Sequence, residues 1–114
     1  GGSGKTVDFV ASGTLPNGKP VILKADGTVE VVAESGGATN LTADNFLGTS
    51  TEAYADTDTA TILLQGGIST NQSGLTIGSD YYVQEDGTLA TTADTISVKL
   101  GKALSATTVL LSGE

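Results

Sequence analysis

Residues 15–29 read LPNGKPVILKADGTV and residues 75–89 read LTIGSDYYVQEDGTL, so the second stretch repeats the first at a constant offset of 60. The first Leu, the Gly at the fourth position and the Asp-Gly-Thr triplet are identical in both stretches. Three consecutive apolar or aromatic residues fill the same positions before the triplet. An ungapped match of this length indicates a duplicated unit, and not two hairpins that are alike through composition alone.

Each stretch begins with the signals of a tight turn next to the core. We expect Leu15 and Leu75 to anchor this turn among buried side chains. We expect Gly18 and Gly78 to let the turn tighten, because glycine adopts backbone conformations that other residues avoid. The duplicated unit therefore starts with a turn that is fixed at one end by a leucine.

A hairpin signal follows in each stretch. Asp26-Gly27 and Asp86-Gly87 each lie between two runs of strand-forming residues. This arrangement predicts a two-residue hairpin turn in which both turn residues have positive φ. We expect Thr28 and Thr88 to begin the two return strands.

The similarity continues at shorter offsets, because the second half has shorter loops. Residues 46–48 are matched by 99–101, and residues 61–64 are matched by 108–111, at offsets of 53 and 47. Each half then consists of a strand, an Asp-Gly hairpin, a second strand, a Leu-Gly strand, a turn and a closing strand. We expect a leader at residues 1–5, a first β-unit at 6–65 and a second at 66–114, which share one core as a single domain.

The hydrophobic residues are gathered in short blocks bounded by Gly, Asp, Asn or Ser, which is typical of strands. The predicted fold class is all-β, a duplicated hairpin-containing unit that forms a small barrel or sandwich with at most one short helical turn. That turn is expected at residues 49–54, where Thr49 and Glu52 have the spacing of a capping box. The predicted strand blocks are residues 7–10, 21–23, 29–32, 61–64, 81–83, 96–98 and 109–111.

The composition excludes several kinds of chemistry. The chain has five Lys, no Arg, no His, no Cys and a formal net charge of −8. Without these residue types there is no Ser-His-Asp triad, no imidazole or thiolate metal site and no bidentate phosphate clamp. The negative charge disfavours nucleic acid and anionic membranes. We therefore expect no enzymatic activity, no cofactor, no metal, no nucleic acid and no membrane partner.

The acidic residues offer the remaining candidates for chemistry. Asp56-Thr57-Asp58, with Glu52 nearby, has oxygen ligands that suit calcium but lacks the full spacing of a calcium loop. A solvated turn is the favoured interpretation, and calcium binding is the alternative. A glycosidase needs two carboxylates at a set separation. Asp26 and Asp86 are explained by turn chemistry, and the absence of Trp leaves little from which to build a platform for sugars.

Four residues are candidates for recognition or subunit contact: Tyr54, Tyr81, Tyr82 and Asn40. Tyr81 and Tyr82 are adjacent, so on a strand one should enter the core and the other should face outward. Ordinary strand packing is the favoured interpretation of the pair. Asn40 lies in the longest loop-like stretch, residues 34–44, which has no counterpart in the second half. A solvated loop without a ligand is favoured there, with a binding loop as the alternative.

Several of these segments resemble β-rich modules of virion proteins from tailed bacteriophages, of the tail-fibre, head-fibre and capsid-decoration type. The pattern of a small residue, then Gly-Leu-x-x-Gly-x-x-Tyr-Tyr-Val and Asp-Gly-Thr-Leu, is similar to such modules, and the likeness covers roughly residues 7–112. The segments that carry it are residues 7–13, 18–29, 45–48, 53–62 and 73–83.

The resemblance implies a non-enzymatic structural part of a bacteriophage virion, located on the particle or outside the cell. Its partners would be other copies of the chain, as a homo-oligomer, or other virion proteins, with a host surface glycan as a further candidate. One alternative is a carbohydrate- or receptor-binding adhesion module that uses the loop at 34–44 or the loop around residues 54–58. Another is the subunit of a self-assembling extracellular filament in which residues 1–12 are donated to a neighbour.

Overall fold

The protein, here a computed structural model, is described at residues 5–33 and 39–112. Most of the expected leader and five residues of the longest loop lie outside these ranges. The strands are β1 (Thr6–Val10), β2 (Pro20–Leu23), β3 (Val29–Val31), β4 (Phe46–Ser50), β5 (Thr59–Leu63), β6 (Ile68–Ser69), β7 (Asp80–Val83), β8 (Leu89–Ala90), β9 (Lys99–Ala103) and β10 (Val109–Leu110). The fold is all-β, as predicted.

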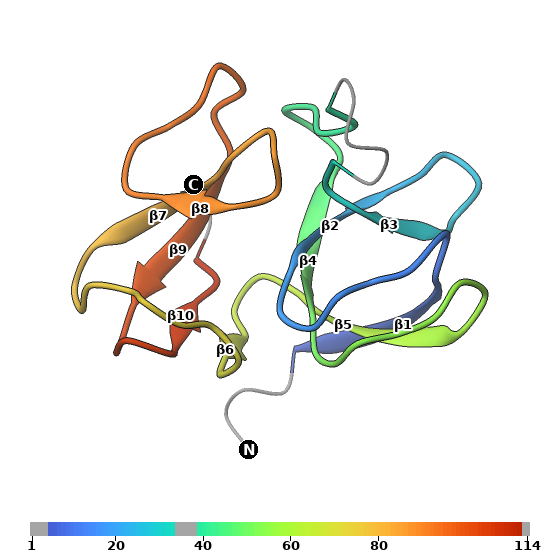
Figure 1. Cartoon of the computed structure of the whole chain (residues 1–114), viewed down its shortest axis with the longest axis horizontal. Helices are drawn as coiled ribbons and strands as arrows, with labels where there is room; N and C mark the ends of the chain where they lie inside the picture. The colour runs from blue at the N-terminus through green and yellow to red at the C-terminus, as the bar shows by residue number, and fades with distance from the viewer. Residues whose placement is uncertain (1–4, 34–38, 113–114) are drawn as a thin grey trace.

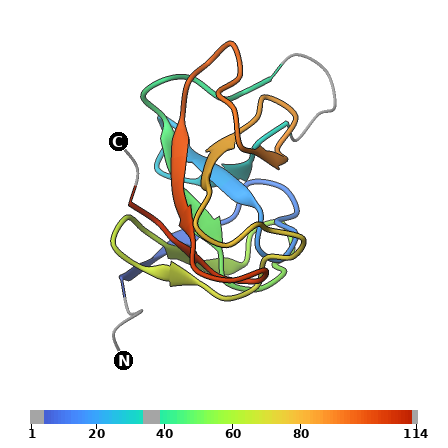
Figure 2. The ribbon, with the colours of Figure 1, turned by 90° about the vertical axis from the view of Figure 1, so that its left-hand side faces the viewer.

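The strands form two antiparallel five-stranded sheets with the same internal order. The first β-unit has the order β1-β5-β4-β2-β3, and the second has the order β6-β10-β9-β7-β8. The two units are the two lobes of Figure 1. Figure 2 looks onto the second unit with the first unit behind it, so the sheets form the layers of a small sandwich.

The register of the two sheets confirms the duplication in detail. Val21 pairs with Gly48 in the first sheet, and Tyr81 pairs with Gly101 in the second. Directly after this pair both ladders shift register, so each unit contains the same bulge at the same position. The matched pairs reproduce the offsets of 60 and 53 that the sequence gives for these strands.

The hairpin turns differ from the predicted type in the same way in both units. The Gly27 N–H donates to the Lys24 carbonyl and the Lys24 N–H donates to the Thr28 carbonyl, so the loop has three residues. Gly27 has a φ of 86°, whereas Asp26 does not have positive φ. This is a type I turn closed by a glycine bulge, and the prediction of positive φ at both residues was wrong. The second hairpin, around Asp86-Gly87, repeats these bonds.

The glycine of each Leu-Gly strand is required by close packing within the sheet. A Cβ atom on Gly48 would collide with the carbonyl of Leu63, and one on Gly101 would collide with the carbonyl of Leu110. Leu63 and Leu110 are themselves matched at the offset of 47. The two units therefore share a tight crossing between the Leu-Gly strand and the closing strand.

Two local predictions were wrong. Residues 49–54 form no helical turn, because Thr49 and Ser50 complete β4, where both are buried. The block at residues 96–98 is not a strand, since β9 begins only at Lys99. Val98 nevertheless extends the ladder, because its carbonyl accepts the N–H of Val83. Both errors concern the point at which a strand begins or ends. Backbone pairing within the sheet decides that point, and the local propensity of the residues does not.

The first unit is closed by its own chain, whereas the second is not. Beyond β1, Ala11 bridges to Val29 and Leu15 bridges to Tyr54, so the segment between β1 and β2 folds over the sheet. The corresponding strand of the second unit, β6, has only two residues. The inner face of the second sheet is therefore not covered by its own unit.

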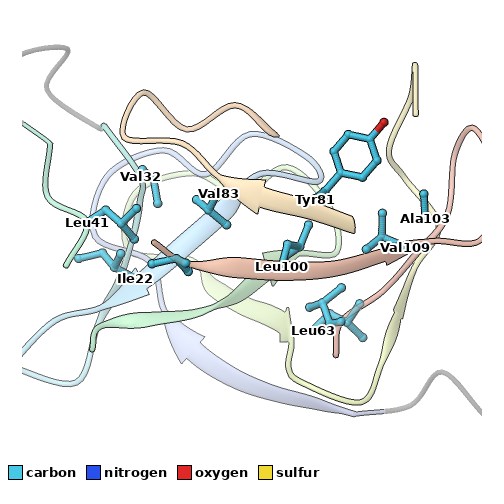
Figure 3. Close-up of a cluster of buried hydrophobic side chains, with 11 residues drawn as sticks. Ile22, Val32, Leu41, Leu63, Tyr81, Val83, Leu100, Ala103 and Val109 are labelled. Carbon is cyan, nitrogen blue, oxygen red and sulfur yellow. The ribbon is translucent and has the colours of Figure 1, made fainter. Parts of the chain in front are cut away.

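The first unit packs against this face of the second sheet, as the buried side chains show. The smaller hydrophobic cluster lies in the first unit alone. The larger cluster draws on both units (Figure 3), with Ile22, Val32, Leu41 and Leu63 from the first and Tyr81, Val83, Val98, Leu100, Ala103, Val109 and Leu111 from the second. Complete burial stabilises the fold by about 1.5–3 kcal/mol for each large apolar side chain, so this contact joins the two units firmly.

The two leucines that open the duplicated unit differ in burial, which gives a test of the packing. Leu15 is fully buried, whereas Leu75 is only half-buried at the edge of the larger cluster. We expect Leu15→Ala to lower the free energy of unfolding by about 2–5 kcal/mol and Leu75→Ala by about 1–2 kcal/mol. Urea denaturation followed by circular dichroism measures both. Equal losses would contradict the unequal burial.

Candidate functional site: the seam between the two units

The seam between the units is fixed by polar contacts from the loop that follows β6. The Asn71 side-chain amide donates to Oδ1 of Asn17 at 2.7 Å and to the carbonyl of Ser50 at 3.2 Å. The Gln72 side-chain amide donates to the carbonyl of Gly18 at 2.7 Å. Two adjacent amides of the second unit thus hold the first turn of the first unit.

Two buried hydroxyls hold these amides and the first turn in place. The Ser69 hydroxyl donates to Oδ1 of Asn71 at 2.7 Å and accepts from the Gln72 amide at 3.0 Å. The Ser50 hydroxyl donates to the carbonyl of Pro16 at 2.5 Å. Since Ser50 and Ser69 are both buried, these bonds fix the rotamers of the seam and keep their polar atoms satisfied.

Thr49 is an exception to this pattern. Its side chain is 1% exposed and its hydroxyl oxygen has no hydrogen-bond partner among the described residues. It lines a hollow of about 220 Å³ whose walls also carry hydroxyls of Ser50, Thr51, Ser69 and Thr70. A polar hollow of this size has room for ordered water, which is the usual partner of such a group.

Asn71 also lines a second hollow, which we call the seam groove. Its volume is about 290 Å³, and it is lined by residues 17–20 of the first unit and by 71–75, Tyr81 and 87–89 of the second. Leu75 and Leu89 supply apolar surface, and amide, ammonium and hydroxyl groups surround it. The groove combines both units, so neither forms it alone.

The tyrosines proposed for recognition are mainly engaged in packing. Tyr81 is 7% exposed, and its hydroxyl accepts the N–H of Thr76 at 2.8 Å. Tyr54 packs against the smaller cluster and its hydroxyl lies 3.1 Å from that of Thr51. Tyr82 is half-buried on the opposite face from Tyr81. Of the three, Tyr81 reaches the seam groove and Tyr82 faces outward.

The Asn40 side chain bonds to the end of β3 and to Ala33. Its Oδ1 accepts the N–H of Ala33 at 2.8 Å, and its amide donates to Glu30 at 2.7 Å and to the carbonyl of Val31 at 2.9 Å. The Asn40 side chain therefore spans the gap at residues 34–38, which lie outside the described part of the chain. These bonds occupy both ends of the amide and account for Asn40 as a structural residue.

Two carboxylates of the acidic loop accept hydrogen bonds from backbone N–H groups. Asp56 accepts the N–H of Gly13 at 2.7 Å, and Asp58 accepts the N–H of Ala55 at 2.9 Å. Within residues 5–33 and 39–112, no three acidic side chains come together as a cluster that could hold a metal ion. This geometry supports a structured turn at the position considered for calcium.

The two aspartates of the hairpin turns have lowered pKa values. The Thr28 hydroxyl donates to Asp26 at 2.6 Å and, with the Thr28 N–H, lowers the pKa of Asp26 below its ordinary value of 3.8. Thr88 lowers the pKa of Asp86 through the same two bonds. On the outer face of the second sheet, Lys102 lies 3.0 Å from Asp80 and lowers the pKa of that carboxyl.

Tyr81 and the turn glycines Gly18 and Gly87 of the seam groove were named from the sequence. Its amide and ammonium groups, at Asn17, Lys19, Asn71 and Gln72, were not predicted as site residues, although a signal exists for the last two. At the offset of 60, Asn71-Gln72 corresponds to Ala11-Ser12 in the first unit. One repeat therefore has two amides where the other has two small side chains. This difference indicates that the two repeats have different neighbours at these positions. Lys19 carried no comparable signal, because its match is Ser79 in an exposed turn.

Comparison of the sequence with known family models and with curated proteins found no match. In the part of the chain that the structure describes, no helix is long and apolar enough to cross a membrane.

A matched pair of glycines tests the seam. Gly27 and Gly87 both have a φ of 86°, but a Cβ on Gly87 would lie 2.9 Å from the carbonyl of Val32 in the first unit. A Cβ on Gly27 would have open space. We expect Gly27→Ala to cost about 1–2 kcal/mol through backbone strain, and Gly87→Ala to cost about 1–3 kcal/mol more through the clash. Equal losses in chemical denaturation would place the second hairpin away from Val32.

The turn aspartates predict how stability depends on pH. A carboxyl with a lowered pKa in the folded state contributes stability above its ordinary pKa of 3.8 and loses it as the pH falls below that value. We expect the urea midpoint to fall on acidification, and the double variant Asp26→Asn, Asp86→Asn to show a smaller fall. Asp44→Asn is the control, since this exposed carboxylate makes no hydrogen bond among the described residues. An unchanged pH profile in the double variant would contradict the assignment.

Proposed function

We propose that the chain is a non-enzymatic structural module of a bacteriophage virion, of the fibre or capsid-decoration type, which assembles as a homo-oligomer through its β-rich surface. The observation that carries the proposal is the open edge of β1, which lies at one end of the first sheet (Figure 1). β1 exposes 46% of Val7 and 47% of Val10. Exposed valines on a free edge strand are a template for pairing with another chain.

The backbone of β1 also has free pairing capacity. The Lys5 carbonyl accepts the N–H of Leu64, and the Ala11 N–H donates to Asp58, so both bond toward β5. Because alternate residues of a strand bond to opposite sides, the peptide groups of Thr6 and Asp8 point to the edge with which no described strand pairs. The open edge ends near Val10, since the next residue, Ala11, bridges to Val29 of β3. A strand from a second copy would satisfy these groups and cover the two valines.

Contact through this edge requires no exchange of strands. Residues 6–10 already pair with β5 of the same chain along their whole length. The proposed assembly therefore extends the first sheet from one copy into the next. This differs from the filament alternative, in which the first residues leave their own sheet.

The chemistry of the described carboxylates supports a structural role. Asp26 and Asp86 accept bonds from their own hairpins, and Asp56 and Asp58 accept bonds from nearby backbone N–H groups. Asp80 is paired with Lys102. Each of these acids stabilises a turn or a strand, which is the use expected of acids in a rigid building block.

Size-exclusion chromatography with light scattering tests the assembly. We expect the chain to form multimers, and the double variant Val7→Lys, Val10→Lys to be monomeric, because two ammonium groups would be desolvated at the joined edge. Ile77→Lys is the matched control, since Ile77 is 70% exposed on a turn of the second unit. We expect this control to remain multimeric.

A monomer for the unaltered chain at high concentration would contradict assembly, and dissociation by Ile77→Lys alone would contradict the choice of edge. Electron microscopy of the parent particle tests the location, since density matching the two lobes is expected on its surface. A particle without such density would overturn the virion role.

A further inference from the structure

The seam groove contains polar groups that neither the fold nor the proposed assembly uses. The Nζ of Lys19, the side-chain NH₂ of Asn17 and the Oε1 of Gln72 have no hydrogen-bond partner among the described residues. Each of these three groups belongs to a side chain or a backbone segment that other hydrogen bonds hold in place. Oδ1 of Asn17 is held by Asn71, and the amide nitrogen of Gln72 is held by the carbonyl of Gly18.

The lining of the groove also includes Tyr81. The Tyr81 oxygen accepts the N–H of Thr76, which leaves the tyrosine proton for another acceptor. Leu75 and Leu89, both half-buried, also line the groove. In Figure 3 the Tyr81 hydroxyl points away from the buried cluster. The lining therefore combines the apolar surface of two leucines, hydrogen-bond donors and acceptors, and one cation.

This pattern selects among ligand classes. The chain carries a net charge of −8, and the Asp86 carboxylate lines a neighbouring hollow together with Lys19. A phosphate or a nucleic acid would meet one lysine in an otherwise negative field. A sugar ring has an apolar face and hydroxyls that both donate and accept, which matches the groups present.

We propose that the seam groove binds a saccharide ring. Its volume of about 290 Å³ is near the lower end for small-molecule sites, so it suits one small polar ring. Lys19, Asn17 and Gln72 would bond its hydroxyls, and Leu75 and Leu89 would meet its apolar face. This site is distinct from the loops at 34–44 and 54–58 that the sequence favoured for adhesion.

The walls of the groove are already ordered before any ligand arrives. Asn71 and Gln72 tie the turn at residues 17–20 to the second unit, and Ser69 fixes both amides. A rim that is fixed in advance loses little conformational entropy on binding. The groove depends only on the contact within one chain, so this inference goes beyond the assembly proposal and does not rest on it.

The test is an NMR titration of the full chain with methyl glycosides of glucose, galactose, N-acetylglucosamine and glucuronic acid. We expect saturable shifts of the backbone amides at Gly18, Gln72, Ser73 and Gly87 with at least one of these probes. Stronger binding of the glucuronoside would place its carboxylate at Lys19, whereas stronger binding of a neutral probe would place a hydroxyl there. Both results support a saccharide site.

Two variants keep the fold and remove free groups. Lys19→Met removes the charge and retains the stem, and Asn17→Asp replaces the free NH₂ but keeps an oxygen for Asn71. We expect each to weaken binding roughly 3- to 10-fold, as the loss of one hydrogen bond implies. Lys5→Met and Gln65→Glu are matched controls at exposed positions outside the groove, and we expect them to bind as the unaltered chain does.

Three results would overturn the proposal. They are no saturable shift with any of the four probes, shifts confined to residues 39–45 or 54–58, and unchanged affinity in both Lys19→Met and Asn17→Asp. Spectra of each variant without ligand show whether its fold is retained. A failure here leaves the light-scattering result untouched, so the two proposals are judged separately.

Discussion

The rest of the structure depends on the burial of the outer face of the first sheet against the second unit. Ile22 and Leu63 point out of the first unit's own interior and are almost completely buried by its neighbour. The same contact covers the inner face of the second sheet, which has no long strand of its own to close it. One apolar interface thus buries both the outer face of the first sheet and the inner face of the second. The same interface sets the distance between the first turn and the second hairpin, and the seam groove lies between these two segments.

Duplicated units usually stack until a polar face ends the array, and here the second unit supplies that face. In the first sheet, the paired row Pro20, Thr49 and Leu63 is buried under the second unit. The matched row in the second sheet is Asp80, Lys102 and Leu110, and its two charged members form an ion pair. Because these positions are charged, the outer face of the second sheet stays exposed to water. A third unit would therefore find no apolar surface there like the one on which the second unit packs.

The candidate site was harder to foresee than the fold. Tyr81 and Tyr82 were correctly expected to face opposite sides, because strand alternation is a local property. Asn40 drew attention as a loop residue, yet its side-chain amide bonds to Glu30, Val31 and Ala33, which precede the loop. Asn71 and Lys19 lie far apart in the sequence and meet only when the two units pack, so no local pattern identifies them as partners in one groove.

By itself the sequence determined the all-β fold, the duplication and the matched order of strands, because side-chain alternation, hairpin glycines and repeated spacing are all local signals. It also placed Gly48 and Gly101 at equivalent positions, where the structure explains them by the close approach of a carbonyl. The tertiary structure alone decided the turn type, the loss of a helical turn at Thr49 and the existence of the seam groove. Each of these depends on contacts between segments that are distant in the chain, and their packing energy exceeds the small preferences that local sequence expresses.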